Sequence, residues 1–465
     1  MPGYTNWKNL YHEEYAQLYE EGYPVGAECV PDMTSPYLPF PMEARATLTA
    51  DDLTPADWEQ AYWNLWKVEA QGVRPDFPFT EPDDYASIIN DAGQAPALIP
   101  LDDAVYEERI KGAWFGRCAG VILGKPLELG WTRQDIRDFL EGADAYPLND
   151  WVPFDSPKCN KSVPDWLRPS TRDHVAYVQP DDDINYTVVA LLLAEQKGTA
   201  FTKRDICENW LNNLPFNTIY SCTKQAYYHL VNLREDRSVE EQINEFPRKL
   251  NPMREGINGA IRTDMWGYLV PGDPRRAAVL AHREASVNLV KNGIYSTMFV
   301  AGCLSAALSR VPDLTTILAG GYAVIPQQSR LAFALRSTEQ WYEETGDWIT
   351  VCDRIYERWG HLPFCGAIQN MCFVMLALRH GKLDYTTSIT TAAMCGVDTD
   401  CTAATVGSIV GAALGYHALD QRWIAPLHDT VRTHVANFGN GTISELAKRT
   451  VACHLRHREE IKRLC

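Results

Sequence analysis

Two apolar segments of the chain contain glycines spaced four residues apart. They are residues 106–124, with Gly112, Gly116, Gly120 and Gly124, and residues 396–415, with Gly407, Gly411 and Gly415. A spacing of four places the glycines on one face of an α-helix, and the missing side chains let another backbone approach that face closely. Both segments therefore predict helices that are tightly packed inside the protein.

The second of these segments opens with two carboxylates. In GVDTDCTAATVGSIVGAALG, Asp398 and Asp400 directly precede the apolar run. The pair therefore lies at the start of a helix that has to be buried. Buried carboxylates require a compensating cation.

A second stretch, VQPDDDINYTVVALLLAE, has the same arrangement. Asp181, Asp182 and Asp183 follow Pro180 and precede a long apolar run. A single aspartate would be explained as a helix cap, but three adjacent carboxylates repel one another unless a positive charge lies between them. The two acid clusters predict a shared site for a hard cation with oxygen ligands. The alternative, acids that only cap helices, predicts no bound metal.

Composition limits the class of function. The chain has 465 residues, 46% of them hydrophobic, which is ample for a large core. A net charge of −17 and a pI near 5.1 argue against a nucleic-acid-binding surface and against binding to anionic membranes. We see no secretory signal and no apolar stretch of membrane-spanning length. The 13 cysteines never form a CxxC pair, which is typical of a reducing cytoplasm, so we expect a cytoplasmic protein.

The chain divides near residue 100. Residues 1–100 are rich in Tyr, Trp and Pro, and we expect a mostly irregular arm packed on the main body. One helix is predicted near residues 55–70, because Thr54 and Pro55 resemble a helix start. The arm would cover part of a cleft or form a subunit contact, and either a monomer or a homo-oligomer is compatible with the sequence.

Residues 101–465 predict a single helical domain. The two glycine-containing helices are expected near 106–124 and 401–415. We expect further helices near 181–197, 203–213, 218–233, 238–246, 274–290, 294–309, 313–323, 327–343, 347–359, 365–380, 384–394 and 441–463. No alternating strand pattern of comparable strength is present, so the predicted fold class is all-α. Residues 141–178 predict a long loop, which is typical of a lid over a site.

Several single residues are candidates for the site. Glu128 follows the glycine-containing helix that ends at residue 124, so it is either solvated or functional. Arg262 and Asp264 predict either a structural ion pair or a pocket wall, close to the Asn258-Gly259 turn.

His361 is a further candidate. It either reaches the cleft or is a satisfied hydrogen-bonding residue.

The order of motifs resembles the ADP-ribosylglycohydrolase family of the dinitrogenase-reductase-activating type. The motifs are GAWFGRCAGVILGKPLE, PDDD, NGAIRTD, NGIYSTMFVAGCLSAAL and GVDTDCTAATVGSIVGAALG. The resemblance covers about residues 105–425 and leaves the N-terminal arm outside. It implies an all-helical domain with two metal ions, Mg²⁺ or Mn²⁺, at the bottom of a cleft. Tyr295 of the fourth motif joins Asn258, Gly259, Arg262 and His361 as a candidate substrate contact.

The resemblance also implies roles for the acids. Asp182 and Asp183 match the first pair of metal-binding acids, with Asp181 as an auxiliary ligand or base. Asp398 and Asp400 match the second pair.

Four positions depart from the family pattern, and at one of them Asp181 stands where the family has a hydroxyl. Cys401 is a poor partner for a hard cation, so we expect Thr402 or a water molecule to bind instead. Val121 stands where the family has an acid, and Ile184 where it has a hydroxyl, which favours a divergent substrate. Glu128 matches the family's glutamate near the catalytic centre, as a general base or a metal ligand.

We therefore expect a hydrolase that cleaves a glycosidic bond of an ADP-ribosyl or related ribosyl substrate, on a small molecule or on a modified protein. The metals would hold sugar hydroxyls and orient a water molecule. One alternative keeps the site but changes the substrate to another N- or O-glycoside. The other is a non-catalytic descendant that binds a ligand or has a structural role.

Overall fold

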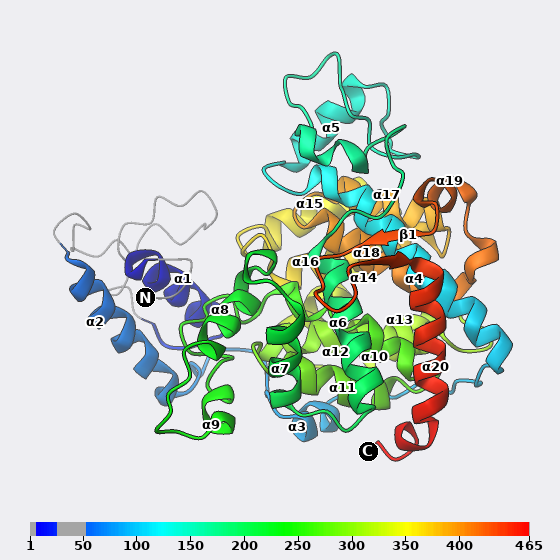
Figure 1. The fold of residues 1–465 in the computed structure, drawn as a ribbon. Helices are drawn as coiled ribbons and strands as arrows, with labels where there is room; N and C mark the ends of the chain where they lie inside the picture. Colours follow the sequence, from blue (N-terminus) through cyan, green and yellow to red (C-terminus); the bar gives the residue numbers. More distant parts are fainter. Residues whose placement is uncertain (1–5, 26–52, 465) are drawn as a thin grey trace.

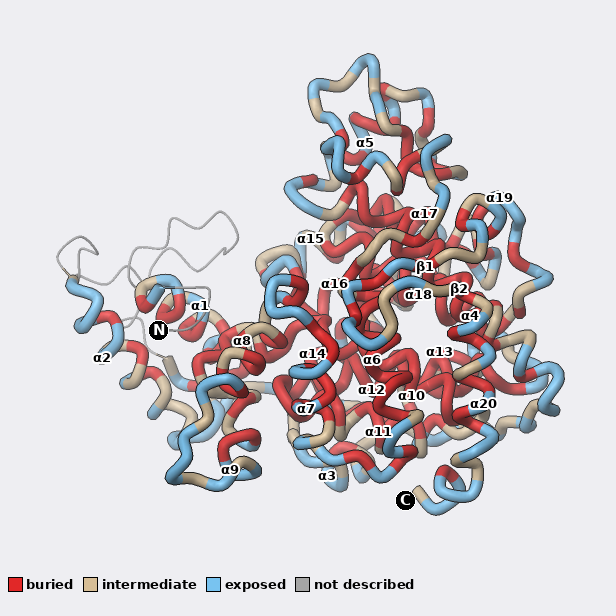
Figure 2. The backbone as a smooth tube through the Cα atoms, in the orientation of Figure 1, coloured by how far each residue is buried: buried red, intermediate tan, exposed pale blue. Residues whose placement is uncertain are grey.

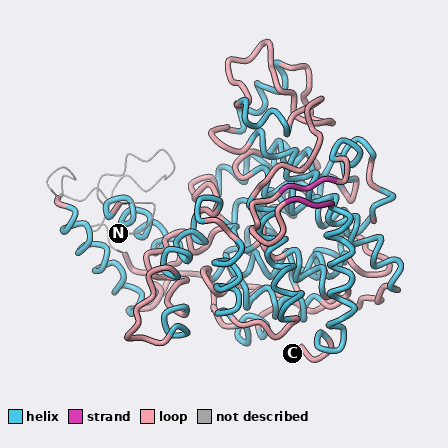
Figure 3. The backbone as a smooth tube through the Cα atoms, viewed as in Figure 1, coloured by secondary structure: helices cyan, strands magenta, loops and turns pink. Residues whose placement is uncertain are grey.

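The computed structural model describes residues 6–25 and 53–464. Within these residues the fold is all-α with one two-stranded sheet, as the sequence predicts (Figures 1 and 3). Strands β1 (Thr430–Arg432) and β2 (Asn440–Thr442) pair antiparallel, with Val431 opposite Gly441. The N-terminal helices are α1 (Trp7–Glu20), α2 (Pro55–Trp66) and α3 (Tyr85–Asn90). The helices of the main body are α4 (Asp103–Gly124), α5 (Arg133–Gly142), α6 (Asp182–Lys197), α7 (Lys203–Asn213), α8 (Ser221–Leu230), α9 (Val239–Ile243), α10 (Asp264–Leu269), α11 (Pro274–Ala285), α12 (Lys291–Ala307), α13 (Leu314–Tyr322), α14 (Arg330–Thr345), α15 (Trp348–Trp359), α16 (Ala367–Gly381), α17 (Tyr385–Cys395), α18 (Thr399–Leu414), α19 (Gln421–Ile424) and α20 (Ile443–Ile461).

The two glycine-containing helices, α4 and α18, pack directly against each other. A Cβ atom added to Gly116 would lie 2.2 Å from the carbonyl oxygen of Gly407, and one added to Gly407 would lie 2.3 Å from that of Gly116. Because Gly112 faces Gly411 at one end and Gly124 faces Thr399 at the other, the helices run antiparallel. This contact brings the end of α4 to the start of α18.

The core surrounds these helices. Every residue of α12 is buried, and α12 packs against α11, α13 and α10 (Figure 2). A helix that is apolar on all sides can be stable only in such an interior position. No helix in the described part of the chain combines the length and the apolar character that a membrane span needs.

The N-terminal arm contains more helix than the sequence predicts. Helix α2 confirms the expected cap, since Thr54 accepts a hydrogen bond from the N–H of Asp57. Helix α1 was not predicted, although its buried Trp7, Leu10 and Leu18 follow a helical period. Two of its polar residues, Glu14 and Gln17, are buried and bind Arg254 and Glu255 of the main body, and these hid the pattern of an ordinary surface helix.

Buried ion pairs attach the arm to the main body. Arg254, which is fully buried, binds Glu14 at 2.9 Å and Glu21 at 2.5 Å. Arg248 binds Glu69 at 2.8 Å. These pairs fix α1 and the end of α2 against the segment that precedes α10.

A long connection separates α5 from α6. Residues 143–181 contain one short 3₁₀ helix, Asp165–Ser170, and no α-helix. With α5, this connection forms the part of the molecule that projects at the top of Figure 1. The segment matches the predicted loop, apart from α5, which the sequence reading did not include.

Candidate metal centre

The starts of two helices bring the predicted aspartates together. Asp181 is the N-cap of α6 and Asp398 is the N-cap of α18, and Glu128 follows α4 after one short turn. Three groups of side chains have potential ligand atoms within 4.8 Å of one another. The groups are Glu128 with Asp398 and Asp400; Asp183 with Asp400 and Cys401; and Asp181 with Asp182 and Asp183. The two acid clusters thus form one site, as the sequence predicts.

A lysine occupies part of this site. Lys125, at the end of α4, places its Nζ atom 2.6 Å from Asp181 Oδ2 and 2.7 Å from the carbonyl oxygen of Pro180. The other oxygen of Asp181 accepts a hydrogen bond from the N–H of Asp183 at 3.0 Å. Both oxygens of Asp181 are therefore bound within the protein.

Arg117 neutralises a second carboxylate. Its fully buried guanidinium donates to Asp183 Oδ1 at 3.1 Å and to Asp264 at 3.0 Å. The Cys401 thiol donates to the other oxygen of Asp183 at 3.2 Å. The Asp183–Arg117–Asp264 arrangement continues to Ser408, whose hydroxyl also binds Asp264.

The remaining acids of the site have no cation partner among the described residues. Asp398 is only 4% exposed, and its Oδ1 atom has no hydrogen-bond partner in the described part of the chain. Burial, together with neighbouring Asp400, raises the pKa of Asp398 well above its usual range. Burial and then Asp400 raise the pKa of Glu128 in the same way. These groups ionise together only if a cation joins them.

The site residues fit a hard divalent cation. Glu128, Asp398 and Asp400 offer oxygen atoms only, and oxygen ligands are those that Mg²⁺ and Mn²⁺ prefer. The Oδ1 atom of Asp398 is buried and has no hydrogen-bond partner among the described residues, so this carboxylate lacks the partner that a bound cation would supply. The Thr402 hydroxyl donates to the carbonyl of Thr399 within α18 at 3.3 Å, and its role as a metal ligand stays a prediction.

The predicted substrate contacts all have partners within the protein. Asn258 accepts a hydrogen bond from Cys222, and a side chain on Gly259 would collide with Thr297. Tyr295 donates to the carbonyl of Pro82 at 2.5 Å.

Arg262 and His361 are bound as well. Arg262 pairs with Glu284 at 2.7 Å, so the Arg262–Asp264 pair considered from the sequence is wrong and Asp264 pairs with Arg117 instead. His361 binds Glu20 of the arm at 2.9 Å. None of the five predicted contacts has a hydrogen bond to the acid site among the described residues.

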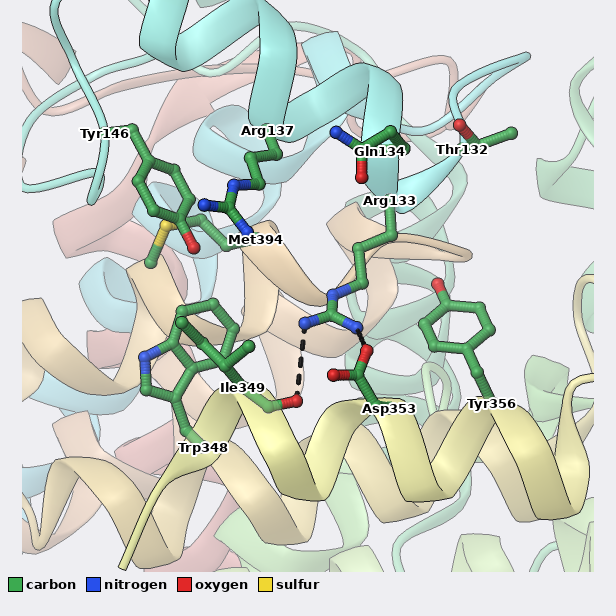
Figure 4. A pocket seen from close by; sticks show the side chains of 10 residues that line it. All are labelled: Thr132, Arg133, Gln134, Arg137, Tyr146, Trp348, Ile349, Asp353, Tyr356 and Met394. Carbon is green, nitrogen blue, oxygen red and sulfur yellow. Dashed lines mark hydrogen bonds and ion pairs between the residues drawn. The ribbon is translucent and has the colours of Figure 1, made fainter.

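Two cavities formed by the described residues do not include the aspartates of the site. One, of about 270 Å³, lies between α1 and the segments 252–256 and 362–368, and its walls are mainly apolar. The other, of about 530 Å³, lies between α5 and α15 (Figure 4). Arg133 reaches across it to Asp353 and to the carbonyl of Ile349, and Arg137 lies beside Tyr146.

Sequence reasoning missed Arg117 and Lys125, although both stand out in the sequence. Each is a charged residue in or next to a segment that the glycine pattern marks as buried. A buried cation requires an anionic partner, so each pointed to an acid elsewhere in the chain.

Comparison with known proteins assigns the family. Residues 102–459 match the ADP-ribosylglycohydrolase family, and the chain belongs to it. This is a family of glycosyl hydrolases, so the chain is a hydrolase of that class. No curated protein matches the sequence. Among solved structures, an "ADP-ribosylglycohydrolase-related protein complex" is similar, with 17% identity, a TM-score of 0.49, and coverage of 76% of this chain and 99% of that one.

Proposed function

We propose that this protein is a metal-dependent hydrolase that cleaves the glycosidic bond of an ADP-ribosyl or closely related ribosyl substrate, with Mg²⁺ or Mn²⁺ as its cofactor. The observation that supports this most directly is the unpartnered Oδ1 atom of Asp398, a residue whose carboxylate offers an oxygen within 4.8 Å of ligand atoms of Glu128 and Asp400. The family supports glycosidic hydrolysis, and the acid site supports the metal.

The proposed chemistry depends on which carboxylates of the site have no ion pair within the described part of the protein. A divalent ion, when bound, would anchor sugar hydroxyls and lower the pKa of a water molecule. Glu128, Asp398 and Asp400 would hold it. Asp182 is half-buried and has no cation partner among the described residues. We therefore assign Asp182 as the base that accepts a proton from the attacking water. Such a base assists an oxocarbenium-like transition state, in which the water attacks as the leaving group departs.

A second candidate substrate class is a glycoside without ADP-ribose. Val121 and Ile184 are both fully buried in the core. They therefore place apolar side chains where the family resemblance leads us to expect an acid and a hydroxyl. Neither side chain can form a hydrogen bond, so a substrate whose binding depends on an acid or a hydroxyl at these positions would lose affinity, which favours a different glycoside.

The experiment compares wild type with an Asp398→Asn/Asp400→Asn variant. Substrates are an ADP-ribosylated peptide, a small ADP-ribose conjugate and simple glycosides, each with Mg²⁺ or Mn²⁺. We expect the variant to lose at least about 10³-fold in kcat/KM on whichever substrate wild type cleaves. Asp353→Asn, in the cavity of Figure 4, is the matched control and should retain activity. Unchanged hydrolysis and unchanged Mn²⁺ affinity in the double variant would refute the proposal.

A further inference from the structure

We infer that the site holds a single divalent cation, and that Lys125 and Arg117 supply from within the chain the positive charge that a second ion would bring. This inference rests on the proposed metal dependence of the site. It differs from the two-ion expectation that follows from family resemblance.

The carboxylates divide into a bound set and a free set. Asp181 and Asp183 form the bound set, because all four of their oxygens already accept from donors within the protein. Glu128, Asp398 and Asp400 form the free set, with no ion pair among the described residues. Asp182 also has no ion pair there, but it stands outside the free set because its carboxylate is grouped only with those of the bound Asp181 and Asp183. Only the free set contains a buried oxygen without any partner in the described chain, Oδ1 of Asp398.

The free set defines one cation position. Its three side chains can each present an oxygen within 4.8 Å of the others. They come from two elements whose separation is fixed, since the hydroxyl of Thr399 donates to the carbonyl of Gly124 at 2.9 Å. The end of α4 and the start of α18 are thereby held together, so this position is formed before any ion arrives.

A second position beside the bound set would place an ion against two fixed cations. An ion on Asp183 would lie close to the Arg117 guanidinium, which is 3.1 Å from the same carboxylate and fully buried. An ion on Asp181 would compete with Lys125 Nζ at 2.6 Å. Like charges at such distances repel strongly in a buried site, and neither cation can withdraw without leaving a buried carboxylate unpaired.

Position 121 strengthens the same conclusion. Val121 lies one turn before Lys125 on α4 and is fully buried. The family resemblance leads us to expect an acid at this position. Without an acid at position 121, and with the Lys125 ammonium one turn later, the site holds less negative charge to attract a second divalent ion.

The test measures Mn²⁺ stoichiometry on the full chain by equilibrium dialysis, and the electronic state of the ions by electron paramagnetic resonance. Wild type should bind one Mn²⁺ per chain at the tight site and give an uncoupled spectrum. Lys125→Met should open the second position, so that a second Mn²⁺ binds and the spectrum shows exchange coupling. Lys161→Met, which removes a more exposed lysine paired with Asp135, should leave one ion bound.

The outcomes separate this inference from the proposed function. One uncoupled ion without hydrolysis of any tested substrate would refute the proposed function and support the inference. Hydrolysis by wild type with two coupled ions would refute the inference alone. No Mn²⁺ bound to wild type would refute both. Because the wild-type stoichiometry is decisive, a Lys125→Met variant that fails to fold does not remove the test.

Discussion

The protein contains two dense groups of acidic side chains, one at the starts of α6 and α18 and one beneath the N-terminal arm. Beneath the arm, six buried or partly buried carboxylates each have a cation at 2.9 Å or closer. The carboxylates are Glu14, Glu21, Glu69, Glu81, Asp83 and Glu255, and the cations are Arg248, Arg254, Lys291 and Arg330. In the metal centre, only Asp181 and Asp183 have such a partner among the described residues.

This difference separates a structural charge network from one that requires a ligand. The pairs beneath the arm are complete, so they can hold α1 against the body without any further component. The free carboxylates of the metal centre remain costly until a cation arrives. Burial of acids alone therefore does not identify a site, whereas burial without partners does.

The largest effect is expected from a substitution that breaks the ion-pair network beneath the N-terminal arm. Arg254→Met would leave Glu14 and Glu21 without their closest cation, and removing one partner of a buried ion pair costs about 3–5 kcal/mol. We expect this loss in the free energy of unfolding by denaturant titration. Arg204→Met, which breaks an exposed pair with Glu208, is the control and should change little. Equal stability of the two variants would show that the arm is held by its apolar contacts instead.

The second prediction concerns a metal ion that would pair the free carboxylates of the metal centre. Mn²⁺ at about 100 times its dissociation constant should raise the free energy of unfolding by about 2.7 kcal/mol over protein in EDTA. The gain should vanish in Asp398→Asn, because that variant loses the unpartnered oxygen. Thermal unfolding with and without the ion measures it. A wild-type melting temperature that is the same with and without Mn²⁺ would contradict a metal centre at these carboxylates.

The smallest effect concerns a base in the arm that is kept uncharged by burial. His12 packs against Tyr11 and Trp58, and burial, aided by nearby Lys8, lowers its pKa from 6.5 to about 4. At a pH between 4 and 6.5, the His12 imidazole is protonated in the unfolded chain and neutral in the folded chain. The free energy of unfolding therefore falls as the pH decreases from 6.5 to 4.

The loss attributable to this imidazole should be on the order of 2 kcal/mol at pH 4, less than the full shift because the ring is partly exposed. Comparing unfolding of wild type and His12→Phe across this pH range isolates it, since the variant lacks the titrating group. Parallel pH profiles for the two proteins would mean that His12 is protonated in the folded state.

Much of the fold follows from local patterns. The glycine spacing predicted α4 and α18, and the apolar run after Asp183 predicted α6 within a residue of its observed start. Helix α1 was missed because its buried face includes Glu14, which reads as surface until its partner Arg254 is known. Such partners are hundreds of residues apart, and a local period does not contain them.

The candidate metal centre was predictable only in part, because local patterns reveal the acid clusters but not their distant partners. The convergence of the acid clusters followed from their repeated position at the start of apolar helices. Which acids are free did not follow, because that depends on where Arg117 and Lys125 place their charges. Thr402 or a water molecule was expected to replace Cys401 at the metal. The Thr402 hydroxyl donates to the backbone of α18, and its binding to a metal stays a prediction.

The contact between α4 and α18 limits how this protein can change in evolution. At Gly116 and Gly407 the two backbones leave no room for a methyl group, so the helices can neither slide nor separate around a larger residue. A single residue inserted between Gly116 and Gly124 would rotate the rest of α4 by about 100° and turn Glu128 away from Asp398. The length of this segment is therefore as strictly constrained as the identity of any ligand, and homologues that keep the site should tolerate insertions only beyond Glu128.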